Sequence, residues 1–218
     1  MEQKSLRILW EDKSFLVVAK PVGVNSEHTQ NNTGLPDLLS QESGGTYFPI
    51  HRLDLGVGGA LLCAKDPEAA SRLSRFAADG KIKKEYLALT HGSLPEKGRM
   101  DDLLFYDRKA GKSFVVERER KGVKTASLSF CALQQIESPF GPLTLVRVFP
   151  ETGRTHQIRV QFANAGHPLL GDKKYGAKEN APIGLSCSRL TFPHPTTGEL
   201  IDVVFLPSGG LWDLCSLH

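Results

Sequence analysis

The chain of 218 residues carries 27 basic and 24 acidic side chains, a formal net charge of +3, and 40% of its residues are hydrophobic. This composition is typical of a globular protein and excludes a collagen, a coiled coil or a wholly disordered chain. No apolar run approaches the roughly 20 residues of a membrane helix, and no secretory signal is visible at the N-terminus. Four scattered cysteines form no Cys-x-x-Cys pair, which favours buried thiols over a zinc site or a disulfide scaffold: Cys63, Cys131, Cys187 and Cys215.

Two short apolar runs near the N-terminus predict strands at residues 7–10 and 15–20. Pro21 ends the second run, because proline cannot extend a central strand. Residues 24–46 are polar and rich in glycine, so they predict a long loop with a short helix around residues 36–41. Loops of this length are often functional.

A buried strand followed by a helix is predicted next. Residues 59–64 form a compact apolar run, and Asp66 and Pro67 are a favourable N-cap and first helical residue. Apolar residues then repeat at helical spacing until Gly80, which suits a left-handed helix cap. Residues 84–90 alternate as a strand does.

The second half of the chain contains mostly predicted strands. They lie at residues 113–119, 125–136, 143–149, 185–192 and 200–206, with one helix at residues 155–165. Because strands outnumber helices and do not alternate with them regularly, the predicted class is α+β.

Basic residues are unevenly distributed along the chain. They outnumber acidic residues eight to five between residues 99 and 124, and six to three between residues 151 and 189. A short lysine run at residues 81–84 precedes Tyr86. Basic residues near aromatics are compatible with nucleic-acid binding, although this charge pattern alone is more often a solvated face.

Two polar segments are candidates for chemistry. In residues 51–54, His-Arg-Leu-Asp, a carboxylate stands beside an arginine and before glycines that allow close approach of a ligand, which suits a nucleophile or a general base. Residues 153–159, Gly-Arg-Thr-His-Gln-Ile-Arg, place Arg154 and His156 at a predicted helix N-terminus, where anions bind favourably. Taken alone, each segment is explained more simply by a surface ion pair or a solvated helix end.

Together with two further motifs, these segments resemble the RluA-type pseudouridine synthases. Residues 51–54 are similar to the family's signature around its catalytic aspartate, and residues 153–176 are similar to its long C-terminal motif. Residues 20–23, Lys-Pro-Val-Gly, resemble its N-terminal motif, and residues 84–86, Lys-Glu-Tyr, the segment with its active-site tyrosine. The four motifs occur in the family's order.

Two departures from the family pattern concern substrate choice and local loop geometry. Residues 57–59 are Val-Gly-Gly where the family usually has Thr-Ser-Gly, and residues 185–187 are Leu-Ser-Cys where it often has Leu-His-Ala.

The resemblance implies a pseudouridine synthase fold, with a central mixed, mainly antiparallel β-sheet flanked by helices and loops. We expect residues 1–218 to form a single catalytic domain without a separate N-terminal RNA-binding domain, because about five residues precede the first predicted strand. The implied activity breaks the glycosidic bond of a uridine in ribosomal or transfer RNA, rotates the uracil and rejoins it through carbon. The resemblance also implies a cytoplasmic monomer that uses no cofactor and no metal.

Residue by residue, the resemblance assigns Asp54 as the nucleophile and Arg159 as the cation that keeps it ionised. Tyr86 would stack against the target uracil. Arg52 would fill the space left by the flipped nucleotide, and Ile158 would form an apolar wall of the pocket. Three further residues are expected to contact RNA: Lys84, Arg154 and His156. His51 is expected to support the loop rather than to act as a catalyst.

Two other functions compete with this interpretation. One is a non-catalytic RNA-binding or RNA-folding protein on the same fold, which the presence of Asp54, Tyr86 and Arg159 disfavours. The other is a hydrolase that releases the base, which a pair of carboxylates would favour. The motifs supply one carboxylate and a cation instead.

Overall fold

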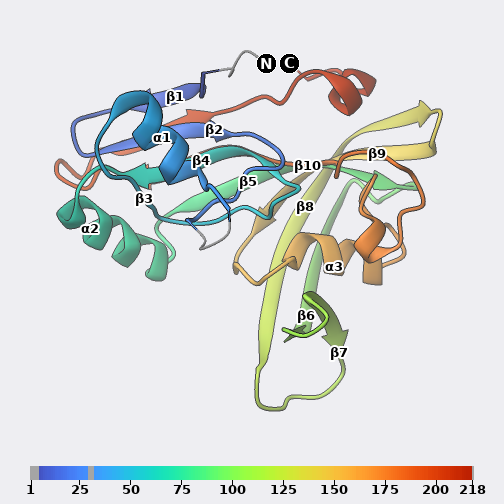
Figure 1. Cartoon of the computed structure of the whole chain (residues 1–218). Coiled ribbons are helices and arrows are strands. Elements are labelled where there is room, and N and C mark those ends of the chain that lie inside the picture. Colours follow the sequence, from blue (N-terminus) through green and yellow to red (C-terminus); the bar gives the residue numbers. More distant parts are fainter. Residues whose placement is uncertain (1–4, 29–31, 218) are drawn as a thin grey trace. The chain divides into compact units, whose positions relative to one another are not determined.

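The computed structural model describes residues 5–28 and 32–217. The chain divides into two compact units (Figure 1). The first unit contains Met1–Lys84 and Ser186–Pro207, and the second contains Glu85–Leu185 and Ser208–His218. The expectation of a single catalytic domain stays a prediction. No helix in the described ranges is long and apolar enough to cross a membrane.

The first unit is built on a mixed sheet with the strand order β1-β2-β4-β10-β11, and β3 also pairs with β4. Its strands are β1 (Ile8–Glu11), β2 (Phe15–Lys20), β3 (Phe48–Pro49), β4 (Gly58–Ala64), β10 (Leu185–Pro193) and β11 (Leu200–Val204). Strands β4 and β10 run parallel, and the other pairs of this unit run antiparallel. The mixed, mainly antiparallel sheet is confirmed, and so are the predicted strands, except that β11 ends at Val204 and not at residue 206. The short strand β3 was not predicted.

The two helices of the first unit begin where the sequence predicts. Helix α2 (Pro67–Ala78) is capped by the Asp66 carboxylate, which accepts a hydrogen bond from the Ala69 N–H at 2.8 Å. Gly80 follows with a φ of 67°, a conformation that glycine adopts without steric cost. Helix α1 (Leu35–Ser43) confirms the short helix predicted in the long loop. Strand β4 lies at the centre of this sheet, between β2 and β10, and each of its seven residues is buried.

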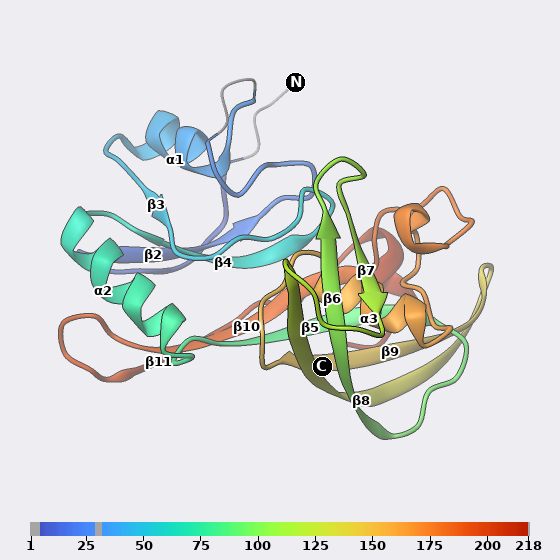
Figure 2. The same cartoon turned by 90° about the horizontal axis from the view of Figure 1, so that it is seen from below.

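The second unit contains an antiparallel sheet in the order β5-β9-β8-β6-β7. Its elements are β5 (Lys83–His91), β6 (Lys97–Asp107), β7 (Lys112–Val116), β8 (Val123–Ser138), β9 (Gly141–Pro150), α3 (Gln157–Asn164) and the short 3-10 helices η1 (Lys173–Tyr175) and η2 (Gly210–Leu214). One apolar core cluster joins β5 and β9, and residues of η2 pack against it. Helix α3 lies beside the β6–β7 hairpin (Figures 1 and 2).

Three predictions need correction in this unit. Strand β6 was not predicted, because most of its residues are partly or fully exposed and show no apolar alternation. Strand β7 ends at Val116 and not at residue 119. Helix α3 begins at Gln157 and not at residue 155, because His156 adopts a left-handed conformation with a φ of 55°.

The cysteines are free thiols, as expected, but they are not all buried. Cys63 and Cys187 are buried, whereas Cys131 and Cys215 are half-buried. Burial raises the pKa of the Cys63 thiol to about 12, so this thiol stays protonated and acts as a small apolar group in β4.

Candidate active site

The loop that carries Asp54 joins β3 to β4 in the first unit. Leu53 and Val57 are buried, whereas Asp54 is half-buried. The Val57 N–H donates to the Asp54 carbonyl at 2.9 Å and closes a tight turn. Gly59 is the second residue of β4, the strand that follows this turn, and a Cβ there would lie 2.3 Å from the Cys187 carbonyl oxygen of β10. The loop is therefore anchored by apolar residues on both sides of a carboxylate that remains accessible.

A hydroxyl from the long loop fixes the backbone next to Asp54. Ser26, which is 5% exposed, accepts a hydrogen bond from the Leu53 N–H at 2.9 Å and donates one to the Leu53 carbonyl at 2.8 Å. On the other side of Asp54, the Leu55 carbonyl accepts from the Gly23 N–H at 2.8 Å. Ser26 was not predicted as part of the site, because one serine in a polar loop does not reveal which backbone it will contact.

A buried lysine places positive charge close to Asp54. Lys20 is 2% exposed, and its Nζ donates to the carbonyls of Pro21 at 3.0 Å and Val24 at 2.8 Å. Burial lowers the pKa of Lys20 to about 8, and the Asp54 carboxylate opposes this shift.

His51 contacts strand β4, which follows the Asp54 loop. Its Nε2 accepts a hydrogen bond from the Leu62 N–H at 3.2 Å. Burial, together with the charge of Lys84, lowers the pKa of His51 to about 3. The arrangement fits the expected structural role.

The two cations predicted to contact RNA from this unit differ in exposure. Arg52 is exposed beside the nucleophile candidate. Lys84 is half-buried, and burial lowers its pKa, although Cys187 acts to raise it. The RNA contacts of both residues stay predictions.

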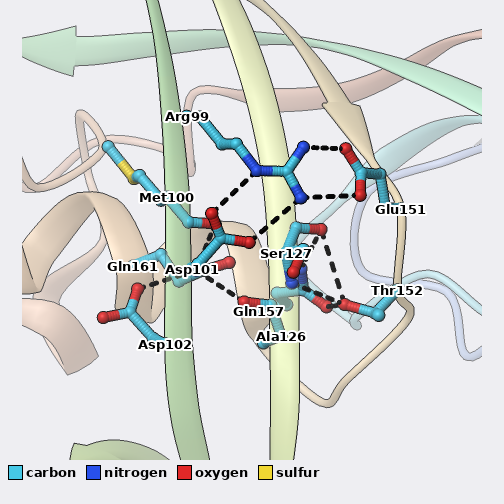
Figure 3. Close-up of polar contacts among 10 residues, drawn as sticks. All are labelled: Arg99, Met100, Asp101, Asp102, Ala126, Ser127, Glu151, Thr152, Gln157 and Gln161. Carbon is cyan, nitrogen blue, oxygen red and sulfur yellow. Dashed lines mark hydrogen bonds and ion pairs between the residues drawn. The ribbon is translucent and has the colours of Figure 1, made fainter.

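Helix α3 carries the candidate cation of the second unit, and two buried glutamines fix this helix. Gln157 Oε1 accepts from the Arg154 N–H at 3.0 Å and from Thr152 Oγ1 at 2.7 Å, and its Nε2 donates to the Ser127 carbonyl at 3.0 Å. One turn later, Gln161 Nε2 donates to Asp102 Oδ2 at 2.7 Å. Figure 3 shows the Gln157 amide reaching Ser127 of β8 and the Gln161 amide reaching Asp102 of β6.

A surface ion network ties the same strands to the loop after β9. Arg99 of β6 forms ion pairs with Asp101 and with Glu151 (Figure 3). All three side chains are about half exposed, so water weakens this network, and α3 depends mainly on the buried amides.

Arg159 projects from α3 into a buried ion pair. Its Nε and Nη2 donate to the two carboxylate oxygens of Asp172 at 2.7 and 2.8 Å. The side chains are 6% and 1% exposed. Ile158 beside it is also buried, and Tyr86 lies on β5, in register with Val148 of β9, with 8% of its surface exposed. The predicted pairing of Arg159 with Asp54 stays a prediction, as do the roles of Tyr86 and Ile158.

A basic groove of about 650 Å³ lies between the β6–β7 hairpin and the loop before α3. Its lining includes the cations Arg108, Lys109, Lys124 and Arg154 and the aromatic residues Phe105 and Tyr106. Arg154 is oriented there by a hydrogen bond from its Nε to the Thr125 carbonyl at 2.9 Å. Cations next to aromatic rings suit a ribose–phosphate backbone and unstacked bases.

His156 stands at the edge of this groove. Its ring meets the Tyr106 ring edge-on at 6.3 Å between centroids, and its Nδ1 lies 2.9 Å from Tyr175 Oη. His156 also has a left-handed backbone conformation, which is costly for a non-glycine residue. No cluster of three or more side chains able to hold a metal occurs in the described parts of the chain.

Comparisons with known proteins agree on one family. A family model described as RNA pseudouridylate synthase matches residues 14–164. The chain is 30% identical over 246 residues to tRNA pseudouridine synthase C of Pasteurella multocida, with 98% of the chain and 100% of that protein covered. It is 34% identical over 209 residues to ribosomal large subunit pseudouridine synthase C of Buchnera aphidicola, with 89% of the chain and 65% of that protein covered.

A solved structure is similar over most of its length. Human RNA pseudouridylate synthase domain containing 1 superposes with a TM-score of 0.81 at 26% sequence identity, which covers 95% of the chain and 86% of that protein. The predicted α+β fold is confirmed.

Proposed function

Because the chain belongs to the RNA pseudouridylate synthase family, whose members are isomerases that act on RNA, we propose that it converts uridine in transfer or ribosomal RNA to pseudouridine with Asp54 as the nucleophile. The observation that carries this proposal is the presentation of Asp54. It is half-buried, the backbone on each side of it is held by Ser26 and Gly23, and the buried Lys20 supplies positive charge.

The reaction exchanges one bond for another within a single nucleotide. Asp54 attacks the target nucleotide, the bond between uracil N1 and ribose C1′ breaks, and the detached uracil turns. A bond then forms between uracil C5 and C1′, and the bond between the nucleotide and Asp54 breaks, which restores the free carboxylate. The hydrogen on C5 leaves as a proton to water, and N1 regains a proton. The product therefore has the composition of the substrate, and no redox partner is required.

The remaining candidate residues assist that exchange. We propose that Arg159 keeps the Asp54 carboxylate ionised and that Tyr86 stacks on the uracil, an interaction worth about 1–3 kcal/mol per base. Ile158 supplies an apolar wall. Arg52 occupies the place of the flipped nucleotide and offsets part of the few kcal/mol that flipping costs.

We propose that the basic groove binds the RNA backbone near the target uridine. Arg154 and Lys124 lie on the same groove as Tyr106, so phosphates and bases both find partners there. His156 at its edge and Lys84 in the first unit are proposed to add contacts. The enzyme is proposed to act as a cytoplasmic monomer, in the compartment that holds its RNA substrates.

The two relatives described above are named for different RNAs, one for transfer RNA and one for the large ribosomal subunit. We therefore propose both classes as substrates to be tested. No comparison favours the non-catalytic alternative.

The test incubates the wild-type protein and Asp54→Asn with unmodified transfer and ribosomal RNA, followed by chemical derivatisation and primer extension to map pseudouridine. Asn keeps the shape of Asp54 and removes its charge and nucleophilicity. We expect stops at defined uridines with the wild type and none with the variant, while RNA affinity stays within about twofold. Tight binding without stops for either protein would support the RNA-binding alternative, and free uracil would support the hydrolase.

A further inference from the structure

Arg159 forms an ion pair with Asp172, a carboxylate other than the proposed nucleophile Asp54. The proposed reaction assigns no chemical step to Asp172. Asp172 is 1% exposed, and both of its oxygens accept hydrogen bonds from Arg159 in a planar bidentate pair. A buried ion pair is a weak source of stability, because desolvation of both charges offsets their attraction. Its bidentate form nevertheless fixes the plane of the guanidinium.

Asp172 is itself held in a compact turn. The Asp172 carbonyl accepts hydrogen bonds from the N–H groups of Tyr175 at 2.9 Å and Ala177 at 3.1 Å. Gly171, directly before it, has a φ of 74°, and a Cβ there would lie 2.1 Å from the Pro182 carbonyl oxygen. The turn therefore requires glycine at this position and presents the carboxylate from a rigid backbone.

Tyr175, at the end of the same turn, contacts the face of the guanidinium. Its ring centroid lies 5.2 Å from Arg159 Cζ, within cation–π range. Its Oη accepts from the Ser113 N–H at 2.8 Å and hydrogen-bonds to His156 Nδ1 at 2.9 Å. Ser113 lies on β7, so the hairpin that lines the basic groove and the ring that packs on Arg159 share one hydrogen-bond network.

We propose that Asp172 and Tyr175 are positioning residues for Arg159: the carboxylate fixes the edge of the guanidinium, and the ring fixes its face. This inference rests on the proposed function, because its consequence is that Arg159 has one orientation in which to act on the Asp54 carboxylate. The Tyr175 hydroxyl additionally connects that orientation to the groove through His156 and Ser113.

The first test reads Arg159 directly and needs no RNA. Hydrogen exchange of the arginine Nε–H groups is followed by NMR in the wild-type protein. The exposed Arg189–Asp202 pair has the same bidentate chemistry, with side chains 40% and 39% exposed, and serves as an internal control. We expect the Arg159 Nε–H to exchange at least about 100-fold more slowly than that of Arg189. Equal rates would overturn the proposal whether or not the protein is an enzyme.

The second test measures turnover for Asp172→Asn, which keeps the shape and removes the charge, with Asp202→Asn as the matched control. We expect a rate of pseudouridine formation about 10- to 100-fold lower for Asp172→Asn, with RNA affinity within about twofold and an altered pH profile. Asp202→Asn should behave as the wild type. A wild-type rate and pH profile for Asp172→Asn would overturn the proposal.

A third comparison separates positioning from folding. Tyr175→Phe keeps the ring and removes the hydroxyl, and we expect its rate to stay within about threefold of the wild type, whereas Tyr175→Ala should fall as Asp172→Asn does. Equal rates for the two Tyr175 variants would contradict the role of the ring. If the wild type modifies no RNA, the proposed function fails, and the exchange rates still decide whether Asp172 holds Arg159.

Discussion

The Asp54 loop and helix α3 hold their charged residues in opposite ways. Asp54 is fixed through the backbone of its neighbours, by the neutral Ser26 hydroxyl and the Gly23 N–H. Arg159 is fixed through its own side chain, by a buried carboxylate. The first arrangement fixes the backbone that carries the reacting side chain, and the second fixes the plane of a side chain.

The two regions also differ in whether their buried charged groups have a counter-charge. Around Asp54, burial lowers the pKa of Lys20 to about 8 and that of His51 to about 3. Positive charge there is costly, and only part of it is retained near pH 7. Around Arg159, a complete ion pair is buried with its counter-charge. Burial in the first region disfavours positive charge, whereas the second region keeps a charged pair in a fixed geometry.

Among variants that test this difference between the two regions, we expect the largest loss of turnover from Arg159→Met. This change removes the charge of the side chain and keeps much of its apolar volume. We expect turnover to fall by at least about 100-fold, because the nucleophile loses its proposed partner and Asp172 is left buried without one. Arg159→Lys retains the positive charge but loses the planar, two-point hydrogen bonding of the guanidinium. We expect its turnover to lie between those of Arg159→Met and the wild type. Single-turnover kinetics check both variants, and full activity of Arg159→Lys would contradict orientation as the function of the pair.

Ser26→Ala tests the backbone clamp beside Asp54. The change leaves the buried Leu53 N–H and carbonyl without their partner, so we expect a loss of about 1–3 kcal/mol of stability and a fall in turnover of roughly tenfold from misplacement of the nucleophile. Thermal melts and initial rates measure the two effects. Ser40→Ala removes a hydroxyl bond to the Pro36 carbonyl within α1 and is the matched control, for which we expect an unchanged rate. Equal rates for the two variants would show that the clamp does not position Asp54.

The lowered pKa of His51 leads us to expect that the free energy of unfolding depends on pH. Its folded pKa of about 3 lies below the ordinary value of 6.5, so protons bind the unfolded chain first and stability falls as the pH drops from 6.5 towards 3. We expect the wild type to lose about 2 kcal/mol more than His51→Gln between pH 7.5 and pH 5. Chemical denaturation at the two pH values measures this difference, and parallel losses would contradict a neutral buried His51.

The smallest effect is expected in the groove. Removing one cation by Lys124→Gln should weaken RNA binding a few-fold and reduce the slope of log affinity against log salt by about 0.7 for a single-stranded contact. Salt titrations of binding measure this slope. Lys13→Gln, at an exposed lysine outside the groove lining, should leave the slope unchanged. A loss of slope of the same size in both variants would argue against a defined groove.

Local signals predicted the elements that depend on local chemistry. Asp66, Pro67 and Gly80 predicted helix α2 because caps act within one turn. Strand β6 was missed because its partly exposed residues have no apolar alternation and it is defined by its pairing with β7 and β8.

The candidate site divides in the same way. Asp54, Arg159 and Asp172 all lie in the motifs at residues 51–54 and 153–176, whereas Ser26 lies in none. The motifs do not reveal the contact between Arg159 and Asp172, across 13 residues, or the one between Ser26 and Leu53, across 27 residues. Such contacts depend on how the chain folds back. Most of the residues were therefore predictable, and the contacts that hold them were not.

The most direct test of the account is the release of tritium from RNA labelled at uracil C5, measured in a single turnover for the wild type and Asp54→Asn. Formation of the C5–C1′ bond must expel that hydrogen, so release reports the isomerisation itself. We predict release by the wild type in proportion to the pseudouridine formed, and none by Asp54→Asn at equal RNA occupancy. Equal release by the two proteins would contradict Asp54 as the nucleophile, and no release by the wild type from either class of RNA would contradict the proposed activity.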